Sequence, residues 1–365
     1  MSELKQKTID LLFQLLETSS PSSIADDLGV NTSTLLRWVE KKSMPQKYYF
    51  DLCRFAGHKL DWSDYTYKEK DQFFTDHNTS QWCYNKACEI ITGYGLSLDD
   101  YTFIEPSAGD GSFYNLFPKD RRIGVDIEPR CEGVIETDFL TWFPPTKSNL
   151  VIGNPPFGMR GNIALKFINH AAKFADFVCF IVPQSFESDG KGSCMKRVKG
   201  LNLVYSQGVD SSFYYPDGSS ASVYTVFQVW SKHYKVEKEI PNLTNILKVY
   251  SLSDGGTPDT TRNKRMHYSC DYYIQSSVFG TDKLSLLTHF DSIPDKKRGA
   301  YGIVLYDKSP EIRAAIESID WGSVAFISTN GAANLRTSII ENSIWNVIPN
   351  SLKEQHQPVD ITKII

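Results

Sequence analysis

The chain has 365 residues, of which 41% are hydrophobic, 22% charged and 13% aromatic, and its formal net charge at pH 7 is -4. This composition is typical of soluble globular proteins and excludes collagen, coiled-coil and low-complexity chains. The length predicts two or three domains. The net charge excludes binding to a polyanion by bulk electrostatics alone, so any nucleic acid must be held by local basic patches.

The apolar run at residues 11–16 is too short for a signal peptide, and no stretch approaches the roughly 18 apolar residues of a membrane span. The seven cysteines form no CxxC pair, which is typical of reduced thiols and of a chain without structural zinc. We therefore expect a cytoplasmic protein in a reducing environment, with no metal and no membrane contact.

Three regions follow from the pattern of apolar residues. Residues 3–57 show helical spacing throughout, and from Tyr101 the pattern changes to short β-type runs. After His233 the chain becomes polar and irregular, with short aromatic strands and one expected helix at residues 310–318. We expect an all-α module at 1–62, a core at 63–235 and an α+β domain at 236–365. This division predicts that the core binds its ligand without residues 1–60.

The β-type runs define the expected fold of the core. They lie at residues 101–104, 122–125, 133–136, 150–153, 177–182, 203–205 and 223–230. Helical spacers between such runs predict a mostly parallel, doubly wound, Rossmann-like α/β sheet. The Gly/Asp/Ser-rich connection before the last run has no helical pattern, so the last two runs are expected to form an antiparallel hairpin at the sheet edge.

The first module carries the spacing of a helix-turn-helix. Ala25 lies where two helices would touch, Gly29 in the tight turn, and Leu35 on the inner face of the second helix. This segment resembles the phage-repressor family of helix-turn-helix proteins. The side that would enter a major groove carries Asn31, Ser33, Thr34 and Arg37. A helical bundle used only for packing or dimer contacts is the open alternative.

A glycine-rich turn, residues 105–113, follows the first β run and is expected to open a helix. Gly109 and Gly111 would let the backbone come into contact with a ligand. Glu105 and Asp110 flank the turn, and two carboxylates suit the sulfonium and ammonium of S-adenosylmethionine better than a pyrophosphate.

Two further β runs end in carboxylates. Asp126 ends the second run, where a carboxylate can accept hydrogen bonds from both ribose hydroxyls. Asp138 follows the third run, where it can accept from an adenine amino group while Phe139 covers the base. Position and order together therefore indicate a site for an adenosine-containing cofactor.

The sequence Asn154-Pro155-Pro156-Phe157 follows the fourth run. An amine conjugated to an aromatic ring is a poor nucleophile, and the Asn154 side-chain oxygen and the Pro155 carbonyl could each accept one of its hydrogens. This draws the nitrogen toward tetrahedral geometry and aims its lone pair at a methyl group. Pro156 stiffens the loop, and Phe157 offers a face on which a flipped base can stack.

In this order, residues 70–233 resemble the S-adenosylmethionine-dependent N6-adenine DNA methyltransferases of the gamma arrangement. The resemblance implies that Asn154 to Phe157 form the catalytic loop. It also implies a cofactor-binding set of Thr75, Glu105, Pro106, Ser107, Gly109, Gly111, Asp126, Ile127, Asp138 and Phe139. Many members have proline soon after the threonine, where this chain has Asp76.

Four amine substrates fit this catalytic loop: adenine in DNA, cytosine N4 in DNA, adenine in RNA, and a protein glutamine. The resemblance implies adenine N6 in duplex DNA, with the C-terminal domain recognising the target. It also implies a restriction-modification or phage modification system, with a cognate restriction endonuclease as functional partner. An RNA adenine methyltransferase and a DNA-binding regulator with an inactive methyltransferase fold are the alternatives.

The densest basic clusters of the C-terminal domain suit phosphates or guanine edges, with ordinary solvated loops as the alternative. These clusters contain Arg262, Lys264, Arg265, Lys296, Lys297 and Arg298.

Overall fold

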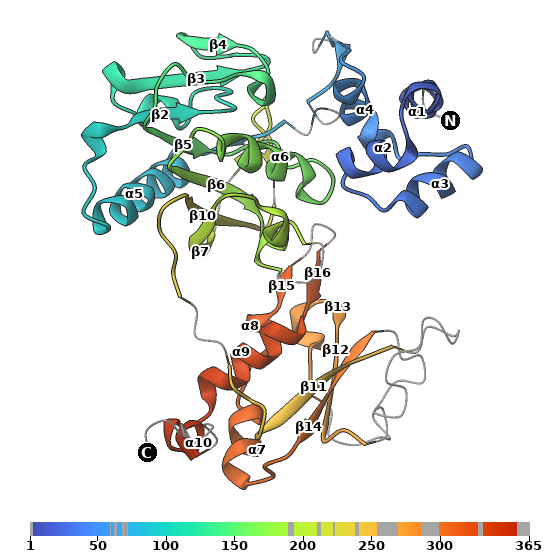
Figure 1. The fold of residues 1–365 in the computed structure, drawn as a ribbon, viewed down its shortest axis with the longest axis vertical. Coiled ribbons are helices and arrows are strands. Elements are labelled where there is room, and N and C mark those ends of the chain that lie inside the picture. The colour runs from blue at the N-terminus through green and yellow to red at the C-terminus, as the bar shows by residue number, and fades with distance from the viewer. Residues whose placement is uncertain are drawn as a thin grey trace, which may run out of the picture. The chain divides into compact units, whose positions relative to one another are not determined.

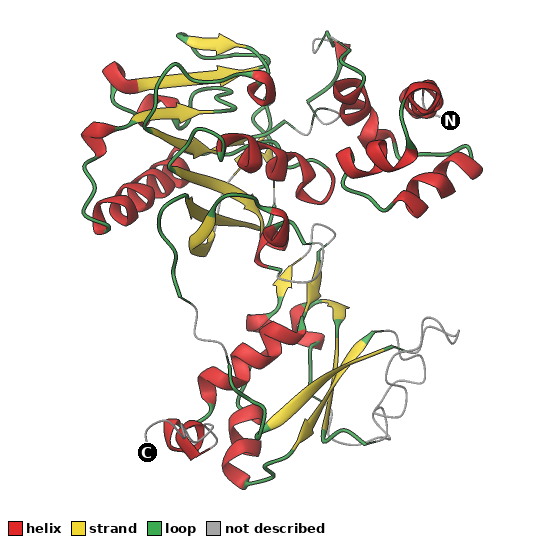
Figure 2. Ribbon diagram, viewed as in Figure 1, coloured by secondary structure: helices red, strands yellow, loops and turns green. Residues whose placement is uncertain are grey.

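The structure is a computed structural model, which describes residues 3–58, 60–61, 64–67, 70, 72–188, 193–209, 213–221, 223–237, 241–253, 269–286, 299–327 and 331–355. The chain divides into two compact units (Figures 1 and 2). The first comprises Met1–Phe186 and Arg197–Val236, and the second Glu187–Lys196 and Glu237–Ile365. Residues 1–62 therefore belong to the same unit as the core.

The N-terminal module is helical, as its apolar spacing predicts. Its helices are α1 (Glu3–Thr18), α2 (Pro21–Asp27), α3 (Thr32–Glu40), the 3₁₀ turn η1 (Gln46–Tyr48) and α4 (Tyr49–Phe55). The Ser20 side chain accepts a hydrogen bond from the Ser23 N–H and so caps the start of α2. Gly29 has φ +65° in the turn between α2 and α3, a backbone conformation that favours glycine.

The central sheet confirms the predicted mixed α/β architecture. Its strands are β2 (Thr102–Glu105), β3 (Arg122–Asp126), β4 (Val134–Glu136), β5 (Asn149–Gly153), β6 (Phe177–Pro183), β7 (Asn202–Val209) and β10 (Thr225–Ser231). Their order is β4-β3-β2-β5-β6-β10-β7. Strands β2 to β6 run parallel, and β10 is antiparallel to both β6 and β7. The expected edge hairpin is present, with β10 as its inner strand.

Helices cover the middle of this sheet. Helix α5 (His77–Gly93) contacts β5, and α6 (Asn162–Ala171) joins β5 to β6. Every residue of β5 and β6 is buried, which is typical of strands covered on both faces.

The helix expected after the glycine-rich turn is not formed. In its place are two 3₁₀ turns, η4 (Tyr114–Leu116) and η5 (Lys119–Arg121). Pro118 disfavours helical backbone at the residue before it, and Phe117 is accordingly extended, so a helix begun here cannot continue.

A small sheet supports the cofactor-motif region. It contains β1 (Phe74–Thr75), β8 (Phe213–Tyr214) and β9 (Ser220–Ala221), all antiparallel. This sheet fixes Thr75 beside the glycine-rich turn.

The second unit combines strands and helices. Its sheets are β11 (Leu247–Leu252) with β14 (Ala300–Leu305) and β12 (Tyr272–Gln275), and β13 (Ser277–Phe279) with β16 (Ala332–Asn334) and β15 (Phe326–Ile327). Its helices are α7 (Pro310–Glu317), α8 (Trp321–Val324), α9 (Thr337–Val347) and α10 (Asn350–Gln355). Helix α7 lies where the sequence predicts one, whereas α8, α9 and α10 were not expected.

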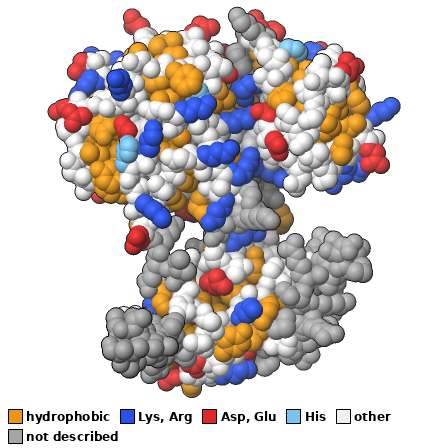
Figure 3. Space-filling model, in the orientation of Figure 1, with side chains coloured by type: hydrophobic (Ala, Val, Ile, Leu, Met, Phe, Trp, Pro, Cys, Tyr) orange, Lys and Arg blue, Asp and Glu red, His pale blue; other side chains and the backbone are white. Residues whose placement is uncertain are grey.

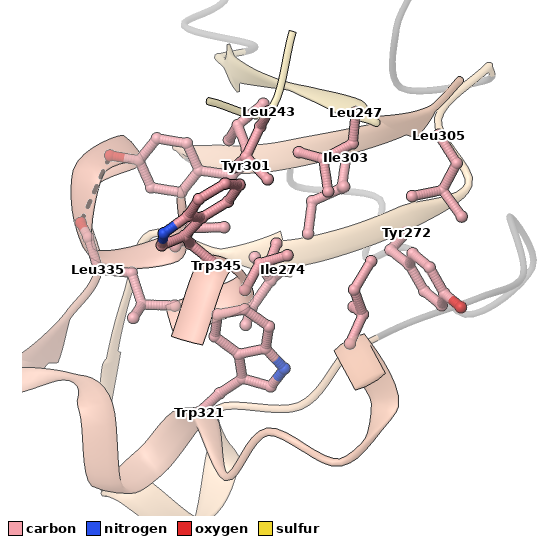
Figure 4. Close-up of a cluster of buried hydrophobic side chains, with 14 of the residues drawn as sticks. Leu243, Leu247, Tyr272, Ile274, Tyr301, Ile303, Leu305, Trp321, Leu335 and Trp345 are labelled. Carbon is pink, nitrogen blue, oxygen red and sulfur yellow. Dashed lines mark hydrogen bonds between the residues drawn. The ribbon is translucent and has the colours of Figure 1, made fainter. Parts of the chain in front are cut away.

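The core of this unit lies between the sheet of β11, β14 and β12 and the helix α9 (Figure 4). Trp321, Trp345 and Tyr301 fill it, and the Tyr301 hydroxyl donates a hydrogen bond of 3.4 Å to the Leu335 carbonyl. Among the described residues of the whole chain, no helix has both the length and the apolar character needed to cross a bilayer.

Candidate active site

The first unit contains a cavity of about 350 Å³, within the range of small-molecule sites. Seven residues of the predicted site line it: Ser107, Gly109, Asp126, Ile127, Asn154, Pro155 and Pro156. The wall is completed by the segment before and within β1, including Phe73 and Phe74, and by residues of the N-terminal module. The cavity thus joins the glycine-rich turn, the end of β3 and the loop after β5.

Gly109 and Asp126 hold each other in place. The Gly109 N–H donates to the Asp126 carboxylate at 2.8 Å, and the Glu128 N–H donates to its other oxygen at 2.7 Å. Burial is the main cause that raises the pKa of Asp126. These bonds orient the carboxylate at the end of β3, on the wall where the sequence places the ribose.

Gly109→Ala is expected to weaken binding of S-adenosylhomocysteine by about tenfold or more. Gly109 has φ +51°, and a Cβ there would lie 2.9 Å from the Phe74 ring, so the alanine displaces the cavity wall. Isothermal titration measures the effect. Gly95→Ala is the control, because Gly95 has φ +79° but a Cβ there would meet no described atom within 4 Å. Equal affinities for the two variants would contradict a role for close packing at Gly109.

Asn154 is held by two hydrogen bonds. Its Nδ2 donates to Thr75 Oγ1 at 3.1 Å, and the Ser107 hydroxyl donates to the Asn154 backbone carbonyl at 3.0 Å. The remaining side-chain atom, Oδ1, is buried and has no hydrogen-bond partner among the described residues. A buried acceptor of this kind is costly unless a ligand supplies a donor, so Asn154 is oriented to accept one.

Thr75 itself is positioned by a hydrogen-bond network around the glycine-rich turn. The Ser112 hydroxyl donates to the Thr75 carbonyl at 2.8 Å, and the Tyr214 hydroxyl donates to Asp110 at 2.5 Å. Asp110 also accepts from Ser112, so its carboxylate fixes the turn within this network. Tyr214 lies far away in sequence, and only its pairing opposite Phe74 brings it here.

Asp76, which follows Thr75, has a local function. Its side chain accepts from the Asn78 and Thr79 N–H groups and caps the start of α5. Helix α5 therefore begins at His77, directly after this cap.

Several residues of the predicted site do not belong to the described cavity wall. They are Thr75, Glu105, Pro106, Gly111, Asp138 and Phe139 of the cofactor set, and Phe157 of the catalytic loop. Glu105 is 2% exposed and accepts from the Tyr114 N–H at 2.5 Å. It therefore lies behind the described wall and ties the turn to β2, and its expected contact with the cofactor stays a prediction.

Two aromatic residues of the predicted site are buried. Phe139 is 1% exposed and stacks on Phe167 at 5.1 Å between ring centroids, so it packs in the interior. Phe157 is buried and packs edge-on against Phe73 at 5.2 Å. Phe73, unlike Phe157, is among the aromatic residues that line the cavity.

The pH dependence of stability tests the position of Glu105. Burial raises the pKa of this carboxyl well above its ordinary value of 4.5. Above pH 4.5 the unfolded chain loses the proton while the folded chain keeps it, so rising pH lowers the free energy of unfolding. Glu105→Gln has no carboxyl group to titrate. The Tm of this variant minus the Tm of the unmodified protein is therefore expected to increase as the pH is raised from 4 to 8. Glu132→Gln, at an exposed position, is the control, and parallel curves for Glu105→Gln would contradict the burial.

The structure describes some of the residues predicted to contact nucleic acid. At the N-cap of α3 and along this helix, Asn31, Ser33 and Arg37 are exposed and Thr34 is half-buried. The predicted contacts of the second unit, Arg262, Lys264, Arg265, Lys296, Lys297 and Arg298, lie outside the described residues. Within the part of the chain that is described, no group of three or more metal-ligating side chains occurs.

No family model matches the chain. The chain is 35% identical over 82 residues to the Type II methyltransferase M.TthHB8I of Thermus thermophilus. The match covers 19% of this chain and 19% of that protein. It is also 36% identical over 70 residues to the Type II methyltransferase M.CvrRI of Paramecium bursaria Chlorella virus XZ-6E. This match covers 16% of this chain and 18% of that protein. The matched part of this chain thus spans less than a fifth of each relative.

Two solved structures are similar to part of the chain. The magnesium protoporphyrin IX methyltransferase of Synechocystis PCC 6803 is 11% identical, with a TM-score of 0.29, over 42% of this chain and 79% of that chain. The N-methyltransferase NodS of Bradyrhizobium japonicum WM9 is 13% identical, with a TM-score of 0.26, over 36% of this chain and 85% of that chain.

Proposed function

We propose that this chain transfers a methyl group from S-adenosylmethionine to the N6 amino group of adenine in duplex DNA. The observation that carries the proposal is the side chain of Asn154. It lies in the loop after β5 and lines the cavity, its Nδ2 is engaged by Thr75, and its Oδ1 is left as an acceptor. The partial likeness to two Type II methyltransferases agrees with this chemistry.

The cavity residues fit an adenosine cofactor. Asp126 presents its carboxylate where ribose hydroxyls would bind, and Ile127 adds an apolar wall beside it. Gly109 leaves room for close approach of the backbone to the ligand. We therefore propose that Ser107, Gly109, Asp126 and Ile127 hold the cofactor, which supplies an activated methyl group on sulfur.

The loop residues prepare the nucleophile. Asn154 Oδ1 and the Pro155 carbonyl each accept a hydrogen of the target amine, which localises the nitrogen lone pair and aims it at the methyl carbon. As the nitrogen–carbon bond forms, the carbon–sulfur bond breaks and sulfur keeps the electron pair. The methylated nitrogen, which now carries a positive charge, then loses one proton to water. No strong base is required.

Duplex DNA is the substrate that the surface of the first unit favours. Exposed polar residues of α3 offer groove contacts, and Lys and Arg side chains gather along the border between the module and the core (Figure 3). We propose sequence-specific modification in a restriction-modification or phage system, with a cognate restriction endonuclease as functional partner and recognition by the second unit.

Transfer of tritium from methyl-labelled cofactor tests the proposal. Duplex DNA, single-stranded DNA and RNA of mixed sequence are supplied in parallel. Label is expected in duplex DNA. Label in RNA alone would favour the RNA methyltransferase alternative, and no label in any polymer despite cofactor binding would favour an inactive regulator.

A further inference from the structure

The N-terminal module supplies part of the cavity wall. Phe50, Asp51 and Arg54 of α4 line the cavity together with the glycine-rich turn and the Asn154 loop. A wall shared in this way indicates that the module has a function at the cofactor site, in addition to any contact with DNA.

The module is fixed to the core through the turn between α2 and α3. Asp27 pairs with Lys166 of α6 at 2.8 Å, and its carbonyl accepts from Asn162 Nδ2 at 3.0 Å. A Cβ at Gly29 would lie 2.4 Å from Asn162 Oδ1, so the turn packs directly on the start of α6. These contacts hold α4 over the cavity.

Asp51 is the unusual member of this wall. Its side chain is buried, with the residue 2% exposed, and its Oδ1 forms an ion pair with Arg54 Nη1 at a distance of 3.5 Å. This contact is not a hydrogen bond, so Oδ1 accepts none from the described residues. A buried carboxylate oxygen without a hydrogen-bond donor is unfavourable, and a ligand that donates one would relieve the cost.

The position of Arg54 places Asp51 at the adenine end of the cavity. Arg54 Nε lies 3.4 Å from Asp138, which follows β4 at the edge where the sequence places the adenine. Asp138 also accepts from the Leu140 N–H at 2.9 Å and is not among the described lining residues. Asp51 and Asp138 thus share Arg54 as a partner, and of the two carboxylates only Asp51 is among the residues that line the cavity.

We propose that Asp51 accepts a hydrogen bond from the amino group of the cofactor's adenine, and that the N-terminal module closes the adenosine end of the pocket. This inference rests on the proposed function, because it assumes an adenosine cofactor in this cavity. It assigns to α4 the role that the family resemblance gives to Asp138.

The test compares two ligands that differ at this amino group. S-adenosylhomocysteine carries the amino group, and S-inosylhomocysteine carries a carbonyl oxygen in its place. Isothermal titration of the full-length protein is expected to show a preference of at least about tenfold for the adenosyl ligand. In Asp51→Asn the amide can donate to the carbonyl oxygen, so the two affinities are expected to become similar. Asp51→Ala is expected to lose the preference as well.

Asp26→Asn, at an exposed position of α2, is the control and is expected to keep the preference. A preference that survives in either Asp51 variant but disappears in Asp138→Asn would overturn the inference in favour of Asp138. Equal binding of both ligands by the unmodified protein would also overturn it and leave the proposed function standing. If the unmodified protein binds neither ligand, the proposed function itself fails.

Discussion

Asn154→Ala is expected to lower the rate of methyl transfer by roughly 10²- to 10³-fold while leaving the affinity for S-adenosylhomocysteine within about twofold. The variant removes the oxygen that accepts from the target amine but leaves the glycine-rich turn and Asp126 in place. The alanine also releases Thr75 Oγ1, which loses its bond to Nδ2. The effect is therefore expected on the chemical step, with cofactor binding largely preserved.

Single-turnover transfer to a methyl-accepting duplex, measured beside titration of the cofactor product, separates the two effects. Asn85→Ala, on the exposed side of α5, is the matched control and is expected to retain both rate and affinity. If Asn154→Ala turned over at the unmodified rate, amine polarisation by this residue would be excluded. A parallel loss of affinity would instead indicate that Asn154 shapes the cofactor pocket.

Removal of residues 1–60 is expected to weaken S-adenosylhomocysteine binding by roughly 100-fold or more. The deletion takes away Phe50, Asp51 and Arg54 and opens the adenosine end of the cavity to solvent. The sequence alone predicts the opposite result, because it treats the module as a separate domain whose removal leaves ligand binding intact. It follows from the contacts of Asp27 with α6, which make the module part of the first unit.

Titration of the truncated chain tests this expectation, with circular dichroism as the check that the core remains folded. A second variant, Lys166→Asp, keeps the module but weakens its attachment, and it is expected to reduce the affinity for S-adenosylhomocysteine. The double variant with Asp27→Lys and Lys166→Asp reverses the ion pair and is expected to restore part of that affinity. A folded truncated core with unchanged affinity would show that the module contributes nothing to the pocket.

Much of the core could be predicted from local sequence, because strands buried on both faces appear as continuous apolar runs. This holds for β5 and β6, whose residues are all buried. The position of Asn154 at the end of such a strand could be predicted for the same reason. The prediction of a helix after the glycine-rich turn was wrong because Pro118 stops it.

The remaining features depend on contacts that are distant in sequence. An aromatic residue after a motif can cover a ligand or enter the interior, and only the packing of Phe139 on Phe167 decides between them. The approach of Arg54 to Asp138 joins residues 84 positions apart and has no periodic signature. The part of the site that lies on α4 could therefore be recognised only in the folded structure.

The central claim is that the chain methylates the amino group of adenine in DNA. Its most direct test is to incubate the purified protein with S-adenosylmethionine and duplex DNA, digest the DNA to nucleosides and identify the product by mass spectrometry. We expect N6-methyladenine, and its loss with Asn154→Ala. Methylation confined to cytosine N4, or no methylated base from DNA that covers all short target sequences, would contradict the claim.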